Sequence, residues 1–115
     1  MARGKFYVVS NVNEIEAVTG YKYPLSTSKG GMIEIGIYRP EWARCWYVIE
    51  RTTGLYICTG GTKNKAISNA MNRADAVYNL LTEADKNPES GVRKARDRMS
   101  AYVKEKAEEP LQPLE

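Results

Sequence analysis

The sequence predicts an α+β fold: an antiparallel sheet of three to four strands, with a long helix packed on one face and a basic C-terminal helix beside it. Two observations lead to this class. Residues 46–59 contain two apolar runs separated by a turn at Thr53 and Gly54, which is typical of a β-hairpin. Residues 63–81 then repeat apolar side chains at helical spacing. The expected order is a strand, a short helix, three strands and two helices, in a single domain over residues 1–109.

A strand and a short helix are expected at the start of the chain. Lys5–Val9 is rich in aromatic and β-branched residues, as strands are. Asn11 or Asn13 is predicted to cap a helical turn that runs through Val18, because a glutamate follows each asparagine three positions later. Gly20 is placed at the end of this helix, a position where glycine is common.

Three further strands are expected between residues 32 and 59. Tyr21–Gly31 is predicted to be a loop, because it contains a proline, three hydroxyl residues and two glycines. Met32–Tyr38 alternates isoleucine with other residues, as a strand with one buried face does. Pro40 ends this strand, because proline cannot donate to a sheet ladder. The hairpin then follows as Trp46–Arg51 and Leu55–Thr59.

Two helices are predicted to complete the domain. The first spans Lys63–Leu81, and Thr62 offers a capping hydroxyl at its start. The second runs from Pro88 to about Glu109, because proline is favoured in the first helical turn. Residues 110–115 are expected to form a flexible tail. The predicted buried face of the long helix consists of Ala66, Ile67, Ala70, Met71, Ala74, Val77, Tyr78 and Leu81.

Composition limits the chemistry available to the chain. Lys and Arg total 17 against 14 for Asp and Glu, and the net charge of +3 is compatible with a polyanionic partner. Histidine is absent, which excludes an imidazole base, a Ser-His or Cys-His nucleophile and the usual zinc ligand sets. The sequence also lacks the phosphate-loop and dinucleotide motifs. We therefore expect a protein that is not an enzyme and uses no metal and no cofactor.

Cysteine usage and hydropathy indicate the compartment. Cys45 and Cys58 lie in or beside apolar runs, where free cysteines usually pack as small hydrophobic residues. Two cysteines are too few to staple a small secreted domain. The apolar stretch near the N-terminus is only Phe6–Val9, too short for a signal peptide or a membrane span. The expected compartment is the cytoplasm, with no membrane contact.

The start of the long helix is similar to that of the double-stranded-RNA-binding domain. Gly61–Ala66 combines a hydroxyl residue, nearby lysines and an alanine at a strand-to-helix junction. The resemblance implies phosphate contacts by Lys63 and Lys65. Asn64 and Ile67 stand where that family carries lysines, and its Gly-Pro-His motif is absent. A three-stranded sheet followed by a helix is shared with the DNA-binding arms of phage integrases, and the chain is assigned to neither family.

Basic residues at two places are candidates for nucleic-acid binding. Two lysines lie at the start of the long helix, and four cationic residues lie in the first half of the last helix. The alternative is an ordinary solvated surface, because the last helix also offers ion pairs between residues four apart. The candidate nucleic-acid-binding residues are Lys63, Lys65, Arg93, Lys94, Arg96 and Arg98.

Asparagines and loop aromatics are candidates for partner binding. Asparagine costs a helix up to roughly 0.7 kcal/mol relative to alanine, so several on one polar face indicate a contact surface. The alternative is a neutral face half covered by the last helix. Aromatic rings in or beside loops can anchor an interface, or else cap the core. The candidate partner-binding residues are Asn64, Asn69, Asn72, Tyr21, Tyr23 and Trp42.

These features predict a small non-catalytic binding protein. Nucleic acid is the leading expected partner, because basic residues and loop aromatics supply charge and stacking. The alternative is a regulator or inhibitor of the phage or mobile-element type that binds a protein or a second copy of this chain.

Overall fold

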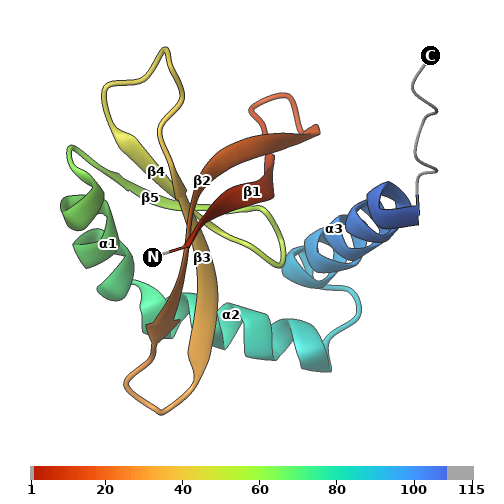
Figure 1. The fold of residues 1–115 in the computed structure, drawn as a ribbon. Helices are drawn as coiled ribbons and strands as arrows, with labels where there is room; N and C mark the ends of the chain where they lie inside the picture. The colour runs from red at the N-terminus through yellow and green to blue at the C-terminus, as the bar shows by residue number, and fades with distance from the viewer. Residues whose placement is uncertain (1, 109–115) are drawn as a thin grey trace, which may run out of the picture.

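Five antiparallel strands and three helices make up residues 2–108, the part of the chain that this computed structural model describes (Figure 1). The strands follow one another across the sheet in chain order. The α+β class is confirmed, with five strands instead of three to four. The expected tail at 110–115 lies outside the described residues. The strands are β1 Ala2–Val9, β2 Ile15–Ser26, β3 Met32–Tyr38, β4 Trp46–Glu50 and β5 Tyr56–Gly60.

The short helix predicted before Gly20 is wrong, because these residues form the first half of β2. Asn13 has a φ of 59° and turns the chain instead of capping a helix. The Ser10 amide donates to the Glu14 carbonyl over 2.8 Å, which closes the β1–β2 hairpin. Residues 15–23 are mostly β-branched and aromatic, and the pairing of residues 15–22 with β1 outweighs the capping pattern.

The loop predicted over Tyr21–Gly31 is also mostly strand. β2 continues to Ser26, so only residues 27–31 turn the chain into β3. Pro24 is tolerated inside β2 because the pairing with β1 starts at Ala2, opposite Lys22, and does not include residue 24. On that side no strand of residues 2–108 pairs with the proline, and its missing N–H therefore costs no ladder bond there.

The sheet curls strongly, so that its first strand approaches the far hairpin. The Val9 amide at the end of β1 donates to the Gly54 carbonyl in the β4–β5 turn over 3.0 Å. Gly36 of β3 provides the space for this, because a Cβ there would lie 2.5 Å from the Phe6 ring. The β1–β2 hairpin therefore folds over one face of β3 and β4.

The β4–β5 turn is fixed by a buried carboxylate. Glu50 is 3% exposed, and its oxygens accept bonds from the amides and the hydroxyls of Thr52 and Thr53 over 2.6 to 3.0 Å. Four donors on one carboxylate satisfy the requirement that a buried charge be hydrogen-bonded.

The helix predicted over Lys63–Leu81 is interrupted, and this part of the prediction is wrong. α1 spans Lys63–Met71 and α2 spans Ala74–Lys86, with a break at Asn72 and Arg73. The first helix packs on β4 and β5, whereas the second packs on β3. The Arg73 guanidinium donates to the Ile57 carbonyl over 2.8 Å and ties the break to the sheet. The two helices thereby follow the curled sheet (Figure 1).

The last helix, α3, spans Gly91–Glu108 and begins three residues later than predicted. Pro88 lies in the preceding turn, and the Ser90 hydroxyl accepts the Arg93 amide over 3.0 Å as the cap. Tyr102 of α3 meets Tyr7 of β1 edge to face, with 5.2 Å between ring centroids. This helix therefore packs beside β1 as well as against α2 (Figure 1).

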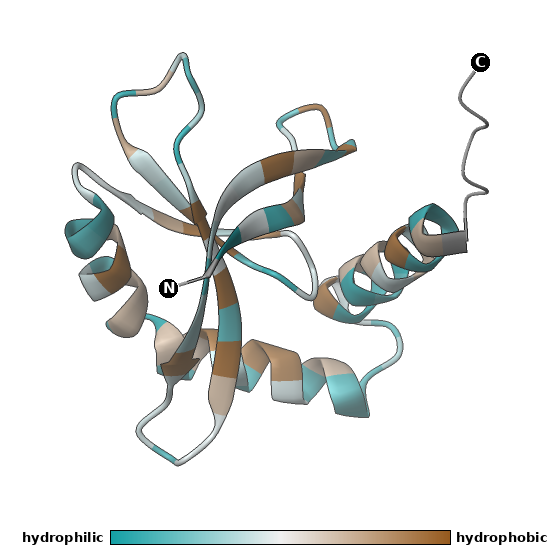
Figure 2. Ribbon diagram, in the orientation of Figure 1, coloured by the Kyte–Doolittle hydropathy of each residue, from teal (hydrophilic) through white to brown (hydrophobic). Residues whose placement is uncertain are grey.

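The two faces of the sheet carry cores of unequal size. The smaller core consists of Phe6, Val8 and Ile49, and we call it the cleft-side core because a surface cleft opens beside it. On the opposite face, α1 and α2 cover the larger helix-side core, and Figure 2 shows hydrophobic segments of β3 and α2 beside one another. The helix-side core consists of Leu25, Ile33, Ile35, Ile37, Val48, Ile57, Cys58, Ala66, Ala70 and Ala74.

Candidate functional site

A cleft of about 1050 Å³ opens on the sheet face that the helices leave uncovered. The β1–β2 loop, residues 10–14, forms one wall and the β3–β4 loop, residues 39–45, forms the other; the two loops rise at the top of Figure 1. We call it the aromatic cleft, after the four rings that line it. These rings belong to Tyr38, Trp42, Tyr47 and Tyr56.

The four rings form one group, in which Tyr47 contacts each of the other three. Tyr47 stands at the centre, with its ring centroid 5.7 Å from Tyr38, 5.9 Å from Trp42 and 6.3 Å from Tyr56. Tyr38 in turn meets Phe6 of the cleft-side core at 6.0 Å. Such spacings are typical of interacting aromatic pairs, so the core holds the inner rings in place.

A β-bulge delivers one of these rings to the cleft. Val48 pairs with Cys58, but the next residue, Ile49, pairs with Tyr56, so β5 carries an extra residue. Ile57 and Cys58 therefore both enter the helix-side core, and Tyr56 turns to the cleft face. Bulges commonly re-aim a side chain in this way.

Two of the rings are unusually exposed. Trp42 is 76% exposed and Tyr56 is 60% exposed, whereas Tyr38 and Tyr47 are half-buried. Large rings left in water contribute little to the core. A group of them lining one cleft is instead typical of a binding surface.

The charged residues lining the cleft are mainly acidic. They are Glu14, Glu16 and Glu41, against Arg39. Burial, and then the nearby Glu16 carboxylate, raise the pKa of the Tyr38 phenol. Its ring therefore stays neutral at physiological pH.

The cysteines lie at different depths. Cys45 lines the cleft and, after burial, is the next cause that raises the pKa of the Tyr47 phenol. Cys58 is in the helix-side core, where burial raises the pKa of its thiol and Arg73 lowers it in part. A raised thiol pKa disfavours the thiolate, the form that acts as a nucleophile.

The predicted lysines lie away from this cleft, at the start of α1. The Lys63 ammonium lies 3.9 Å from the Tyr21 ring centroid and 5.7 Å from that of Trp46. Lys65 is exposed, and its backbone amide donates to the Thr62 hydroxyl over 3.1 Å, which confirms the predicted cap. The structure thus brings Lys63 onto an aromatic pair.

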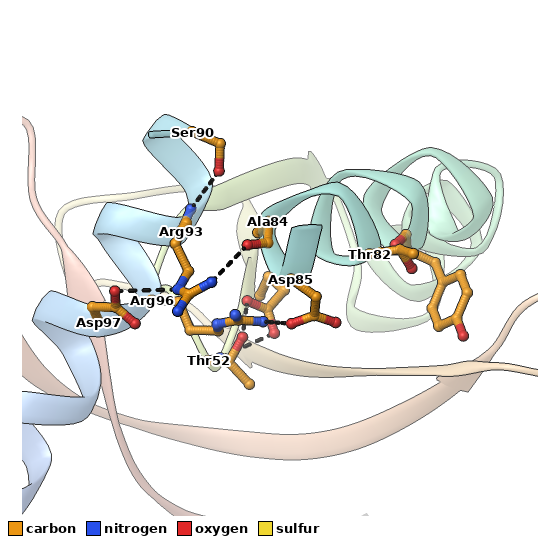
Figure 3. A network of polar contacts seen from close by, with 10 residues as sticks. Thr52, Thr82, Ala84, Asp85, Ser90, Arg93, Arg96 and Asp97 are labelled. Atoms are coloured by element: carbon orange, nitrogen blue, oxygen red, sulfur yellow. Dashed lines mark hydrogen bonds and ion pairs between the residues drawn. The ribbon is translucent and has the colours of Figure 1, made fainter. Parts of the chain in front are cut away.

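The predicted basic residues of α3 bind groups of the chain itself, as Figure 3 shows for Arg93 and Arg96. Arg93 contacts Asp97 and the Ala84 carbonyl, and Arg96 pairs with Asp85 over 2.6 Å. Lys94 lies 3.8 Å from Glu89, and Arg98 donates to the side chain and the carbonyl of Asn13. These contacts fix α3 to α2 and to the β1–β2 loop.

The predicted partner-binding residues are dispersed. The Asn69 amide donates to the Thr59 carbonyl over 2.9 Å, Asn72 caps α1, and Asn64 is exposed near its start. Tyr21 and Tyr23 pack against the helix-side core. Of this set, Trp42 lines the aromatic cleft.

Comparisons with protein-family models, curated proteins and solved structures found no match to this chain. Within residues 2–108, no group of three or more Cys, Asp or Glu side chains is placed to hold a metal ion. None of the helices in the described part has the length and apolar content that a membrane span requires. Inference about function therefore rests on the surface of the molecule itself.

Proposed function

We propose that this protein is a non-catalytic binding module that recognises a protein partner through the aromatic cleft. The observation that carries the proposal is the series of contacting rings, two of them more than half exposed, in one cleft. Tyrosine and tryptophan dominate the energetics of protein interfaces because they bury a large area at a low cost in conformational entropy. We also propose a cytoplasmic location, since both cysteines are free thiols.

Acidic residues favour a protein partner over a nucleic acid at this cleft. Three glutamates line it against one arginine. Carboxylates repel phosphate, and nucleic-acid sites are strongly positive as a rule. The cleft therefore offers rings for contact without the positive charge that a polyanion needs.

Affinity capture with matched baits tests the proposal. The test bait carries Trp42→Ala and Tyr56→Ala, and the control bait carries Leu80→Ala, which removes a side chain that is 56% exposed on α2. We expect a protein retained by the wild type and the control, after nuclease treatment, to be lost from the test bait. Equal retention on all three baits, or loss of every partner on nuclease treatment, would contradict the proposal.

Nucleic-acid binding at the start of α1 is a second proposal, supported by a separate observation. Arg39 and Lys63 both lie over the Trp46 ring, at 5.8 and 5.7 Å from its centroid, and Lys65 is exposed nearby. Two cations beside a partly buried ring supply positive charge next to an aromatic surface. The basic residues of α3 would have to exchange their present partners to join this surface.

Anisotropy titrations with duplex DNA, duplex RNA and single strands at low salt test this second proposal. Neutralising about three phosphates should give log affinity a slope of roughly −3 against log salt. Lys63→Glu with Lys65→Glu should weaken binding, whereas Lys104→Glu, exposed on α3, should change it little. Flat titrations with all three nucleic acids would exclude this function.

A further inference from the structure

We infer that the aromatic cleft takes a positively charged side chain, lysine or arginine, from a basic segment of the partner protein. The inference rests on the proposed function in that it takes the cleft as the recognition surface. It goes further by assigning the chemistry of the occupant.

The aromatic rings of the cleft favour a cation as its occupant. The faces of tyrosine and tryptophan carry negative electrostatic potential and attract ammonium and guanidinium groups. The chain uses the same chemistry on its other face, where the Lys63 ammonium lies 3.9 Å from the Tyr21 ring centroid. In the cleft, four rings converge, and no lysine is among the residues that line it.

The carboxylates that line the cleft also favour a cation. Among the ion pairs within residues 2–108, none includes Glu14, Glu16 or Glu41, so these charges are not neutralised by a salt bridge there. The single cation of the lining, Arg39, directs its guanidinium over Trp46, which does not line the cleft. The excess negative charge attracts a cation and repels an acidic or phosphorylated segment.

The neutral phenols strengthen this assignment. Burial and neighbouring groups raise the pKa of Tyr38 and of Tyr47, so both keep their protons well above neutral pH. The Glu16 carboxylate contributes to the shift at Tyr38, which shows that its field reaches the ring. A cation entering between them would contact the face of a neutral ring and a carboxylate at the same time.

The size of the cleft favours a peptide over a small free cation. Its volume of about 1050 Å³ is at the upper end of typical ligand sites and much larger than one side chain. An extended segment placed between the two loops could insert its basic side chain among the rings while its backbone contacts the rim.

Nuclear magnetic resonance offers a direct test, because the chain contains two tryptophans with different positions. Trp42 lines the cleft, whereas Trp46 packs against the helix-side core. The probe is a blocked hexapeptide with one arginine and one lysine among glycine and serine. Its matched control replaces these two by citrulline and acetyl-lysine. We expect the basic peptide to shift the Trp42 indole N–H signal saturably and to leave that of Trp46 in place.

Charge variants test the assignment of the carboxylates. Glu16→Gln with Glu41→Gln removes two exposed charges. This double variant should bind the basic peptide with an affinity lower by roughly fivefold or more, since each exposed ion pair contributes a factor of about two to five. Glu83→Gln, on the exposed side of α2, is the matched control and should leave affinity unchanged.

Several outcomes would overturn the inference. One is equal affinity for the basic and the neutral peptide, and another is an unchanged affinity in the Glu16→Gln, Glu41→Gln variant. A shift of Trp42 by a single-stranded oligonucleotide and not by the basic peptide would also overturn it. If no basic peptide binds while Trp42→Ala with Tyr56→Ala still loses a captured protein, the inference fails and the proposed function stands. If that double variant keeps every partner, both fail.

Discussion

The helix-covered face of the sheet and the cleft face differ in side-chain type as well as in burial. On the helix side, isoleucines 33, 35 and 37 from β3 are nearly inaccessible beneath α1 and α2. On the cleft side, the small core of Phe6, Val8 and Ile49 is flanked by aromatic rings, and two of these rings stand largely in water. Aliphatic residues fill a closed core with well-defined rotamers, whereas tyrosine and tryptophan suit a surface that is dry on one side and wet on the other. The contrast separates a face built for stability from one built for contact.

Deleting a buried isoleucine on each face should give the largest effects and measure this difference. Ile35→Ala should cost about 3 to 4 kcal/mol, because it leaves a sealed cavity in addition to the lost apolar transfer. Ile49→Ala should cost only about 2 kcal/mol, because Ile49 lines the cleft and the space joins open solvent. Unfolding of both variants in urea measures the two losses in the free energy of unfolding. Equal costs would show that the cleft-side core is as closed as the other.

The β4–β5 turn connects the two faces, and loss of its Glu50 carboxylate should have the next largest effect on stability. Glu50→Gln removes one of the two acceptor oxygens that serve Thr52 and Thr53, and we expect a loss of about 2 kcal/mol for the unpaired donor and the lost charge. Thr52→Ala, at an exposed position, should cost about 1 kcal/mol or less. Urea midpoints measure both variants. A Glu50→Gln protein as stable as the wild type would show that the turn does not depend on the charge.

Two asparagines on the helices should respond with opposite signs. Asn69→Ala removes the bond to the Thr59 carbonyl, worth about 1 kcal/mol, which exceeds the helix-propensity gain of up to roughly 0.7 kcal/mol. Asn79→Ala, whose side chain has no hydrogen bond within residues 2–108, should gain about 0.5 kcal/mol. Thermal melts distinguish the two. If both variants are stabilised, Asn69 does not anchor α1 to β5.

The parts of the fold predicted from the sequence depend on short-range patterns. The alternation of β3, the hairpin of β4 and β5 and the Thr62 cap all lie within a few residues of their signals. The sequence does not predict the first half of β2, because an asparagine-glutamate capping pattern favours a helix locally, whereas pairing with β1 makes these residues a strand. The break at Asn72 was missed because apolar spacing continues through it, and the curvature of the sheet is invisible in one sequence.

The candidate site was predicted less well than the fold, because strand register decides which side chains reach the cleft. The sequence points to Trp42 because it is an aromatic residue in a predicted loop. Tyr47 and Tyr56 lie in strands, and their faces depend on pairing and on the bulge after Val48. A shift of one residue in a strand exchanges its two faces, so neither ring can be assigned to a surface before the register is known.

On the helix side, the exposed Asp75 carboxylate links α2 to the β2–β3 turn, and its removal should have a small, pH-dependent effect on stability. Hydrogen bonds from Ser28 hold the pKa of Asp75 below its usual 3.8. A lowered folded-state pKa contributes stability above the unfolded value and loses it as the pH falls. The difference between wild type and Asp75→Asn should therefore be present at neutral pH and shrink below about pH 3.8. Ser28→Ala should reduce this pH dependence without abolishing it, because the backbone amide of residue 28 still donates to Asp75. A constant difference between wild type and Asp75→Asn across the titration would contradict this.

The smallest effect on stability is expected where the effect on binding should be largest. Trp42→Ala deletes the largest side chain of the cleft, yet that side chain is 76% exposed, and among the rings of residues 2–108 it contacts that of Tyr47 alone. Surface substitutions of this kind stay within about 0.5 kcal/mol, so urea unfolding should not distinguish the variant from the wild type. The same variant should lose partner capture, because interface tryptophans commonly contribute 2 kcal/mol or more to association. A clear loss of stability would instead place Trp42 among the residues that hold the β3–β4 loop, and the cleft face would then resemble the helix face after all.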